Sequence, residues 1–372
     1  MPKIDTDNKN IILHKQLLWL SIAQLSGASI IYLPGVIAAG RNVWISNIIA
    51  SVVGYMVIFS HYLPLSSFPN ISLSTAFNKY WGTFLGRLVN IYYFLFFFIL
   101  SCLIVSDIFY FGKTTMPETP SYIFTIFFLI PAIYAVKLGI EVIVRLIGFL
   151  TPIFVVIYCV LFFLTLPKLD FARMLPIMSE GIKPVLAGAI PNMIFPFAQI
   201  LPVVFYYKNV KENDTGKRKF VQYTFISILM ATILLASRAL SAVTAFEEST
   251  LKTLTYPPFS TIRIIEVGDI IERLDPLLLA IFYGTTFFKF ILTYNVICEI
   301  ISDCFKVGKP KDFALPIAVL IGVSTPFLIP RFDIILETVV PYFYVFLPLF
   351  LPIPLLLFLT IKFKNRKMQN YN

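Results

Sequence analysis

Long apolar segments decide what this chain can fold into. Runs of about 20 mostly apolar residues follow one another along the sequence, and the backbone can satisfy its hydrogen bonds inside lipid only as helices or closed barrels. Hydrophobic residues make up 58% of the chain and charged residues 13%, well below the share in soluble proteins. We therefore predict an all-α integral membrane protein with about ten spans, at 13–38, 43–63, 88–108, 121–136, 146–166, 185–206, 220–246, 276–304, 313–330 and 334–361.

The spans leave no room for a soluble domain, so we predict a single transmembrane domain over residues 1–372. The first residues lack the short apolar stretch and cleavage site of a removable signal peptide. Placing both termini in the cytoplasm puts 19 of the 30 Lys and Arg residues in inner segments and nine in outer loops, as the positive-inside rule favours. A basic face on the anionic leaflet of the lipid bilayer explains the net charge of +10 without a nucleic-acid partner.

Two spans carry interruptions at corresponding places. The first span contains Ser26, Gly27, Ala28 and Ser29 in its middle, and the sixth carries three prolines, Pro191, Pro196 and Pro202. A proline inside a helix removes a backbone hydrogen bond. Five spans per half make the halves, about 13–166 and 185–361, run in opposite directions, so we predict a five-plus-five inverted repeat (LeuT-like) with helices 1 and 6 broken. The segments 64–87 and 247–275 are predicted to form short surface helices.

Broken helices imply a binding site for a small solute near the membrane midplane. Backbone groups released at a break must face protein, water or a ligand. Amides near Ser29, Ile30 and Ile31 would attract an anion, and carbonyls near 25–27 and 194–195 would attract a cation or ammonium. A single interruption is more often a plain kink, but the matched pair favours a receptacle for a zwitterion such as an amino acid.

Ionisable residues inside the spans indicate which groups could take part in ion or proton coupling. Lys289 lies near the middle of the eighth span, where functional use is the default interpretation; its ammonium would replace a coupling cation or carry a proton. Snorkelling is the alternative for Lys289, and either snorkelling or an outer ion pair is the favoured interpretation for Arg238, near the outer end of its span. Asp107 is predicted at an outer span end. No His, Cys or carboxylate cluster has catalytic or metal-binding spacing, so we expect neither an enzyme nor a cofactor.

The motif Gly27-Ala28-Ser29-Ile30 resembles the break in the first span of amino acid–polyamine–organocation transporters. The chain more closely resembles the B subunit of GerA-type spore germinant receptors over nearly its whole length. That resemblance rests on segments 27–46, 184–208 and 256–279, the last containing Tyr256-Pro257 and Glu272-Arg273. Where the family often has Phe-Pro-Phe-Gly-Glu, this chain has Phe195-Pro196-Phe197-Ala198-Gln199.

The resemblance implies a subunit in the inner membrane of a bacterial spore. It would bind a nutrient germinant and trigger germination with an A subunit and a C-subunit lipoprotein. A pocket without a nearby carboxylate would suit an uncharged or zwitterionic germinant, which leaves amino acids, nucleosides and sugars open. The expected ligand-binding residues are Ser26, Gly27, Ala28, Ser29 and Ile30 in span 1, Leu95 and Ile99 in span 3, and Ile194, Phe195, Phe197 and Gln199 in span 6.

Two other functions remain open at the level of sequence. A proton-coupled permease for amino acids or related solutes would have the same fold and nearly the same site, and would differ only in carrying the solute across. A structural subunit that binds nothing would leave the broken helices and Lys289 without a purpose.

Overall fold

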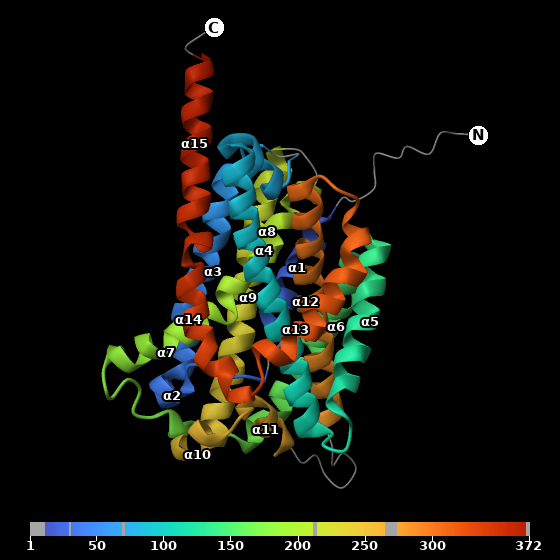
Figure 1. Cartoon of the computed structure of the whole chain (residues 1–372). Helices are drawn as coiled ribbons and strands as arrows, with labels where there is room; N and C mark the ends of the chain where they lie inside the picture. The colour runs from blue at the N-terminus through green and yellow to red at the C-terminus, as the bar shows by residue number, and fades with distance from the viewer. Residues whose placement is uncertain (1–11, 30, 69–70, 211–213, 265–273, 370–372) are drawn as a thin grey trace, which may run out of the picture.

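A computed structural model of the chain describes residues 12–29, 31–68, 71–210, 214–264 and 274–369, which form a bundle made almost entirely of helices (Figure 1). Eight helical segments among them are long and apolar enough to cross a membrane, so the chain is a multi-pass membrane protein. The α-helices are α1 (His14–Ser26), α2 (Val36–Ala39), α3 (Val43–Leu65), α4 (Leu73–Thr115), α5 (Ser121–Leu138), α6 (Ile140–Thr165), α7 (Ile182–Ile194), α8 (Pro202–Phe205), α9 (Asp214–Ala245), α10 (Glu248–Thr253), α11 (Pro257–Arg263), α12 (Asp275–Phe305), α13 (Ala314–Leu328), α14 (Phe332–Phe350) and α15 (Pro352–Gln369).

The predicted break in the first span is confirmed. Helix α1 ends at Ser26, and Ala28 adopts a positive φ of 55°, which right-handed helix does not allow. Helical structure resumes only at α2, which has four residues. The span is therefore two short helices joined by a non-helical segment, and Ile30 within that segment lies outside the described residues.

The predicted break in the sixth span is also confirmed. Helix α7 ends at Ile194, two residues before Pro196, since a proline disfavours helical conformation in the residue that precedes it. The chain continues as short turns of helix: η5 (Phe197–Ile200), α8 and η6 (Tyr206–Asn209). Eight of the 13 residues of α1 are buried, and in the sixth span all residues of η5 and α8 are buried but only five of the 13 residues of α7.

The two interrupted spans approach each other at backbone distance. A Cβ atom added to Gly35 would lie 2.1 Å from the carbonyl oxygen of Gly188, and one added to Gly188 would lie 2.5 Å from Cβ of Ala39. Real Cβ atoms do not make contacts this short. Glycine at both positions therefore lets α2 pack directly on α7 and holds the two breaks together.

Gly188→Ala should destabilise the protein by about 1–3 kcal/mol, because the added methyl group overpacks the α2–α7 contact. The measurement is the midpoint of thermal unfolding of the purified protein in lipid nanodiscs. Gly148→Ala in α6 is the matched control, since its Cβ would lie no closer than 3.4 Å to Gln16. Equal midpoints for the two variants would contradict the packing argument.

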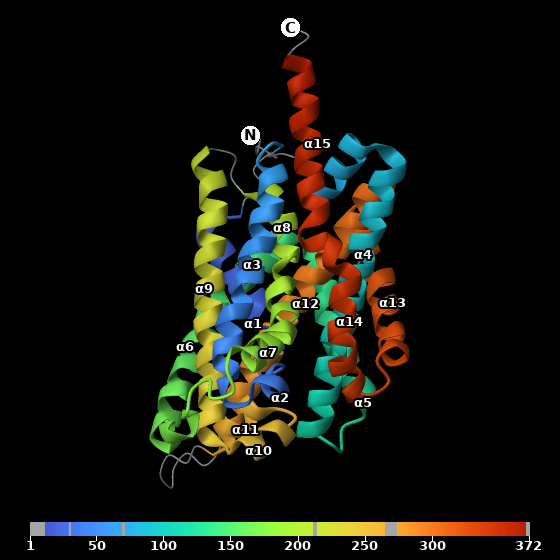
Figure 2. The same cartoon turned by 90° about the vertical axis from the view of Figure 1, so that its left-hand side faces the viewer.

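Short helices occur in both segments predicted to lie along the surface. Gly82, with φ 83° and ψ 169°, interrupts α4 and separates a short helix over 73–81 from the membrane-crossing part. Helices α10 and α11 occupy the opposite end of the bundle (Figures 1 and 2). The remainder of the second segment, including Glu272 and Arg273, falls mostly outside the described residues.

The tenth span differs from its prediction. A single span was expected over 334–361, but α14 ends at Phe350 and α15 begins at Pro352, with Leu351 in a non-helical conformation between them. Pro352 cannot donate a backbone hydrogen bond, so the helix is not continued through it. Figures 1 and 2 show α15 extending beyond the rest of the bundle.

Candidate solute-binding site

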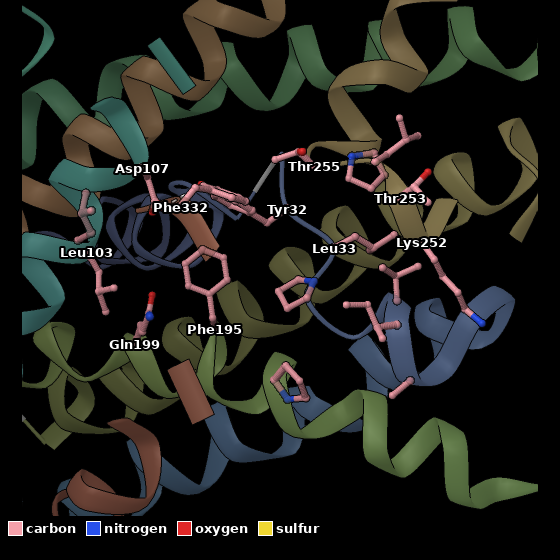
Figure 3. Close-up of a pocket in the computed structure, with 18 of the residues that line it drawn as sticks. Tyr32, Leu33, Leu103, Asp107, Phe195, Gln199, Lys252, Thr253, Thr255 and Phe332 are labelled. Atoms are coloured by element: carbon pink, nitrogen blue, oxygen red, sulfur yellow. Dashed lines mark hydrogen bonds between the residues drawn. The ribbon is translucent and has the colours of Figure 1, made fainter. Parts of the chain in front are cut away.

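A cavity of about 420 Å³ lies between the two broken spans. Its walls come from the segment after α1, from α4, from the break after α7, from the start of α14 and from the segment between α10 and α11 (Figure 3). Its lining is mostly apolar, with few polar side chains, which is the usual character of a small-molecule site. The polar and aromatic residues that line it are Tyr32, Asp107, Phe195, Gln199, Lys252, Thr253, Thr255 and Phe332.

The cavity reaches the end of the bundle that carries α10. The lining residues Ile37, Lys252 and Thr253 are exposed there, whereas Tyr32, Asp107 and Gln199 are buried. At the opposite end, Lys208 Nζ lies 2.9 Å from Glu299 Oε2, and Ser72 donates a hydrogen bond of 2.5 Å to Asp303. These contacts join η6 and the start of α4 to α12. Among the described residues, the cavity is thus exposed at the α10 end, and these contacts tie the helices together at the other end.

Ion pairs organise the rim beside α10. Glu248 accepts from Lys252 at 2.7 Å and from Arg41 at 3.1 Å. The hydrogen bond from Lys252, followed by that from Arg41, lowers the pKa of Glu248. The rim therefore presents cationic side chains that are already paired with a carboxylate.

The break in the first span packs directly on α12. Lys289 is fully buried, and its Nζ donates to the carbonyl oxygen of Gly27 at 3.2 Å while lying 4.6 Å from the ring centre of Phe195. The amide of Ala28 donates to Thr286 Oγ1 at 2.9 Å. One lysine ammonium thus contacts both broken spans, through a freed carbonyl in the first and an aromatic face in the sixth.

Tyr32 and Asp107 form the polar centre of the cavity wall. The Tyr32 hydroxyl donates to Asp107 Oδ1 at 2.9 Å, and both residues are almost completely buried. The Tyr32 ring packs against Phe195, Tyr256 and Phe332, with ring centroids 5.5–6.1 Å apart. Asp107 and Lys289 are near enough to interact electrostatically. The arrangement brings one carboxyl group and one amino group to the junction of the breaks.

Gln199 offers a further polar group. Its backbone carbonyl accepts from Gln24 Nε2 at 2.8 Å, which ties α1 to η5. Its side-chain Oε1 is buried without a hydrogen-bond partner among the described residues, although the side chain lines the cavity. An unpartnered buried acceptor of this kind is suited to a ligand donor.

The residues expected to bind ligand divide into three groups. Phe195 and Gln199 line the cavity. Gly27, Ala28 and Ser29 are buried close to α12, outside the cavity wall, and Ser26 lines a separate small cavity. Ile194 and Phe197 are buried in the core without reaching the cavity.

The contacts expected from the third span need correction. Leu95 is 44% exposed and Ile99 is only partly buried, and neither lines the cavity. The face of α4 that reaches the cavity instead carries Leu100, Leu103, Ile104 and Asp107. This span has no break to fix its register, so the sequence does not indicate which of its residues face the cavity.

Sequence reasoning also missed important polar residues. The expected absence of a carboxylate is wrong, since Asp107 lines the cavity and is only 2% exposed. An acid within an apolar run was the available signal. No comparable sequence pattern marked Tyr32 and Phe332 as residues of the cavity. Arg238 is 3% exposed, so the expected snorkelling is wrong as well, and no ion pair with Arg238 is found among the described residues.

Structural comparison identifies the fold. The chain superposes on a sodium-coupled sialic acid symporter with a TM-score of 0.65 and 11% identity, covering 90% of this chain and 78% of that one. It superposes on Mhp1, a nucleobase–cation symport transporter solved with bromovinylhydantoin, with a TM-score of 0.60 and 16% identity, covering 87% and 75%. These likenesses confirm the LeuT-like transporter fold with helices 1 and 6 broken.

Sequence comparison identifies the family. Spore germination protein KB of Bacillus subtilis (strain 168) is 25% identical over 366 residues, which cover 95% of each chain. Spore germination protein XB of Bacillus anthracis is 26% identical over 273 residues, covering 73% of this chain and 74% of the relative. The sequence model of the spore germination protein (spore permease) family matches residues 11–330. A match over most of the length shows that this chain belongs to the spore germination protein family.

Proposed function

We propose that this chain is the membrane subunit of a nutrient germinant receptor. It binds a small solute in the cavity between the broken spans, and binding triggers spore germination. The observation that carries the proposal is the cavity of about 420 Å³ walled by both breaks, in a member of the spore germination family. That volume accommodates an amino acid, a nucleoside or a sugar.

The same family supports a location and partners. We propose that the chain resides in the inner membrane of a bacterial spore and acts with the A and C subunits of a germinant receptor, without catalytic activity of its own. The excess of Lys and Arg in the terminal segments and the loops on the same side supports a cytoplasmic position for both termini. The cavity mouth beside α10 then faces the side from which a nutrient arrives.

A proton-coupled solute permease is the second candidate, and the fold shared with a solved sodium-coupled symporter favours it. Vesicles containing the purified protein distinguish the two functions when binding and uptake of labelled amino acids, nucleosides and sugars are measured in parallel. Saturable binding without uptake is the result expected of a receptor. Concentrative uptake driven by a proton gradient would overturn the receptor proposal, and absence of both would overturn the solute site.

Asp107→Asn should weaken binding of amine-bearing solutes about 10- to 100-fold, because it removes the carboxylate that pairs with an ammonium group. The asparagine Oδ1 still accepts from Tyr32, so the local packing is retained. Affinity for sugars should change little. Equilibrium binding across the labelled panel measures both effects.

Glu180→Gln, at an exposed carboxylate, is the control for Asp107→Asn and should leave all affinities unchanged. An equal loss for amines and sugars in Asp107→Asn would show that the carboxylate supports the structure rather than selecting the solute.

A further inference from the structure

A second buried cation lies away from the cavity described above. Arg238 on α9 is 3% exposed, and its Nε and Nη1 atoms have no hydrogen-bond partner among the described residues. A buried guanidinium with two unpartnered nitrogens is costly, and more so inside a membrane. Such a group implies that something else occupies its surroundings.

Two small cavities, each about 20 Å³, meet at Arg238. The first cavity lies between α6, α9, α11 and the start of α12. The second lies between α1, α6, α9 and α12. Figure 2 shows α6 and α9 running beside each other. A space of this size holds a single particle close to the size of a water molecule. It is too small for an amino acid, nucleoside or sugar.

The lining of these cavities favours a negative charge. No aspartate or glutamate is present among the described residues that line them, whereas hydroxyl groups come from Ser26, Thr151, Tyr158 and Thr285, among others. Thr151 Oγ1 is itself buried without a hydrogen-bond partner. Nε and Nη1 of Arg238 and the Thr151 hydroxyl are unused donors on residues that line the second of these cavities, and an anion there satisfies them together.

We propose that Arg238 and Thr151 bind one small halide ion, chloride, between α1, α6, α9 and α12. The site lies directly behind the break in the first span: Ser26 precedes Gly27, and a Cβ on Gly27 would lie 2.6 Å from the carbonyl oxygen of Thr285. The ion neutralises Arg238 and stabilises the packing of α1 on α12. This site goes beyond the proposed germinant-binding function and does not depend on it.

The test measures thermal unfolding of the full chain in lipid nanodiscs while chloride replaces gluconate at constant ionic strength. The midpoint should rise saturably with chloride. Bromide should act similarly, and sulfate should not, because it is too large for the cavity. Arg238→Gln should abolish this dependence, and Thr151→Val, which removes only the hydroxyl, should raise the half-saturating chloride concentration about tenfold.

Arg145→Gln is the control, since Arg145 is an exposed arginine on α6 paired with Glu141, and it should keep the dependence of the native protein. Identical midpoints in gluconate and chloride would overturn the proposal and indicate that water alone fills the cavities. Chloride dependence retained in Arg238→Gln would place the ion elsewhere. If Arg238→Gln does not fold, an unchanged half-saturating concentration in Thr151→Val overturns the proposal by itself.

Discussion

Gly27→Leu is expected to abolish solute binding, with a loss in affinity of at least about 100-fold. A Cβ at this position would lie 2.6 Å from both Cβ of Lys289 and the carbonyl oxygen of Thr285. The carbonyl belongs to the backbone of α12 and cannot turn aside, so α1 must move away. That movement breaks the hydrogen bonds from Lys289 to Gly27 and from Ala28 to Thr286. Equilibrium binding of the solute found with the vesicle panel measures the effect.

Two alanine variants separate the effect of crowding at Gly27 from a general intolerance of glycine replacement. Gly27→Ala should weaken binding about tenfold, because the methyl group alone creates the close contacts. Gly54→Ala should leave affinity unchanged, since its Cβ would make ordinary contacts at 3.6 Å with Ile228 and Phe197. Native affinity in Gly27→Ala would show that the break does not need to touch α12.

Lys289→Met is expected to destabilise the folded protein by about 3–5 kcal/mol and to reduce solute binding. Methionine preserves much of the chain length but removes the ammonium that contacts the Gly27 carbonyl and the Phe195 ring. The variant also leaves Asp107 without the buried positive charge that interacts with it. Thermal unfolding in nanodiscs and solute binding provide the two measurements.

The double variant Lys289→Met with Asp107→Asn tests the electrostatic part of this argument. Removing both charges should restore stability relative to Lys289→Met alone, with a coupling of about 0.5–3 kcal/mol between the two positions. Simple addition of the two single effects would mean that Lys289 acts only through the first break. A midpoint of native value in Lys289→Met would contradict any stabilising role for the ammonium.

The broken helices could be predicted from sequence because their causes are local. Proline lacks the backbone donor that a helix needs, and a cluster of small residues weakens the helix around it. The position of Lys289 was readable for a similar reason, since a charge in the middle of a long apolar run is costly wherever that run lies. The tenth span shows the limit: prolines at 341, 348, 352 and 354 all fall within it, and local sequence does not say which of them ends a helix.

The lining of the cavity could not be predicted in the same way. Leu95 and Leu103 are chemically identical and lie on one helix, yet one is exposed and the other reaches the cavity. The difference depends on how α4 is rotated against α12 and α14. The burial of Asp107 and Arg238 likewise depends on which helices surround them.

The membrane location, the interrupted spans and the buried lysine could be read from the amino-acid sequence alone. Each follows from the free energy of placing a residue type in lipid or in a helix, whatever its neighbours. Packing between helices places Lys289 against Gly27 and Phe195. The same packing makes Tyr32 and Asp107 the polar wall of the cavity and encloses Arg238. These contacts join residues as many as 262 positions apart, and packing between distant helices alone determines them.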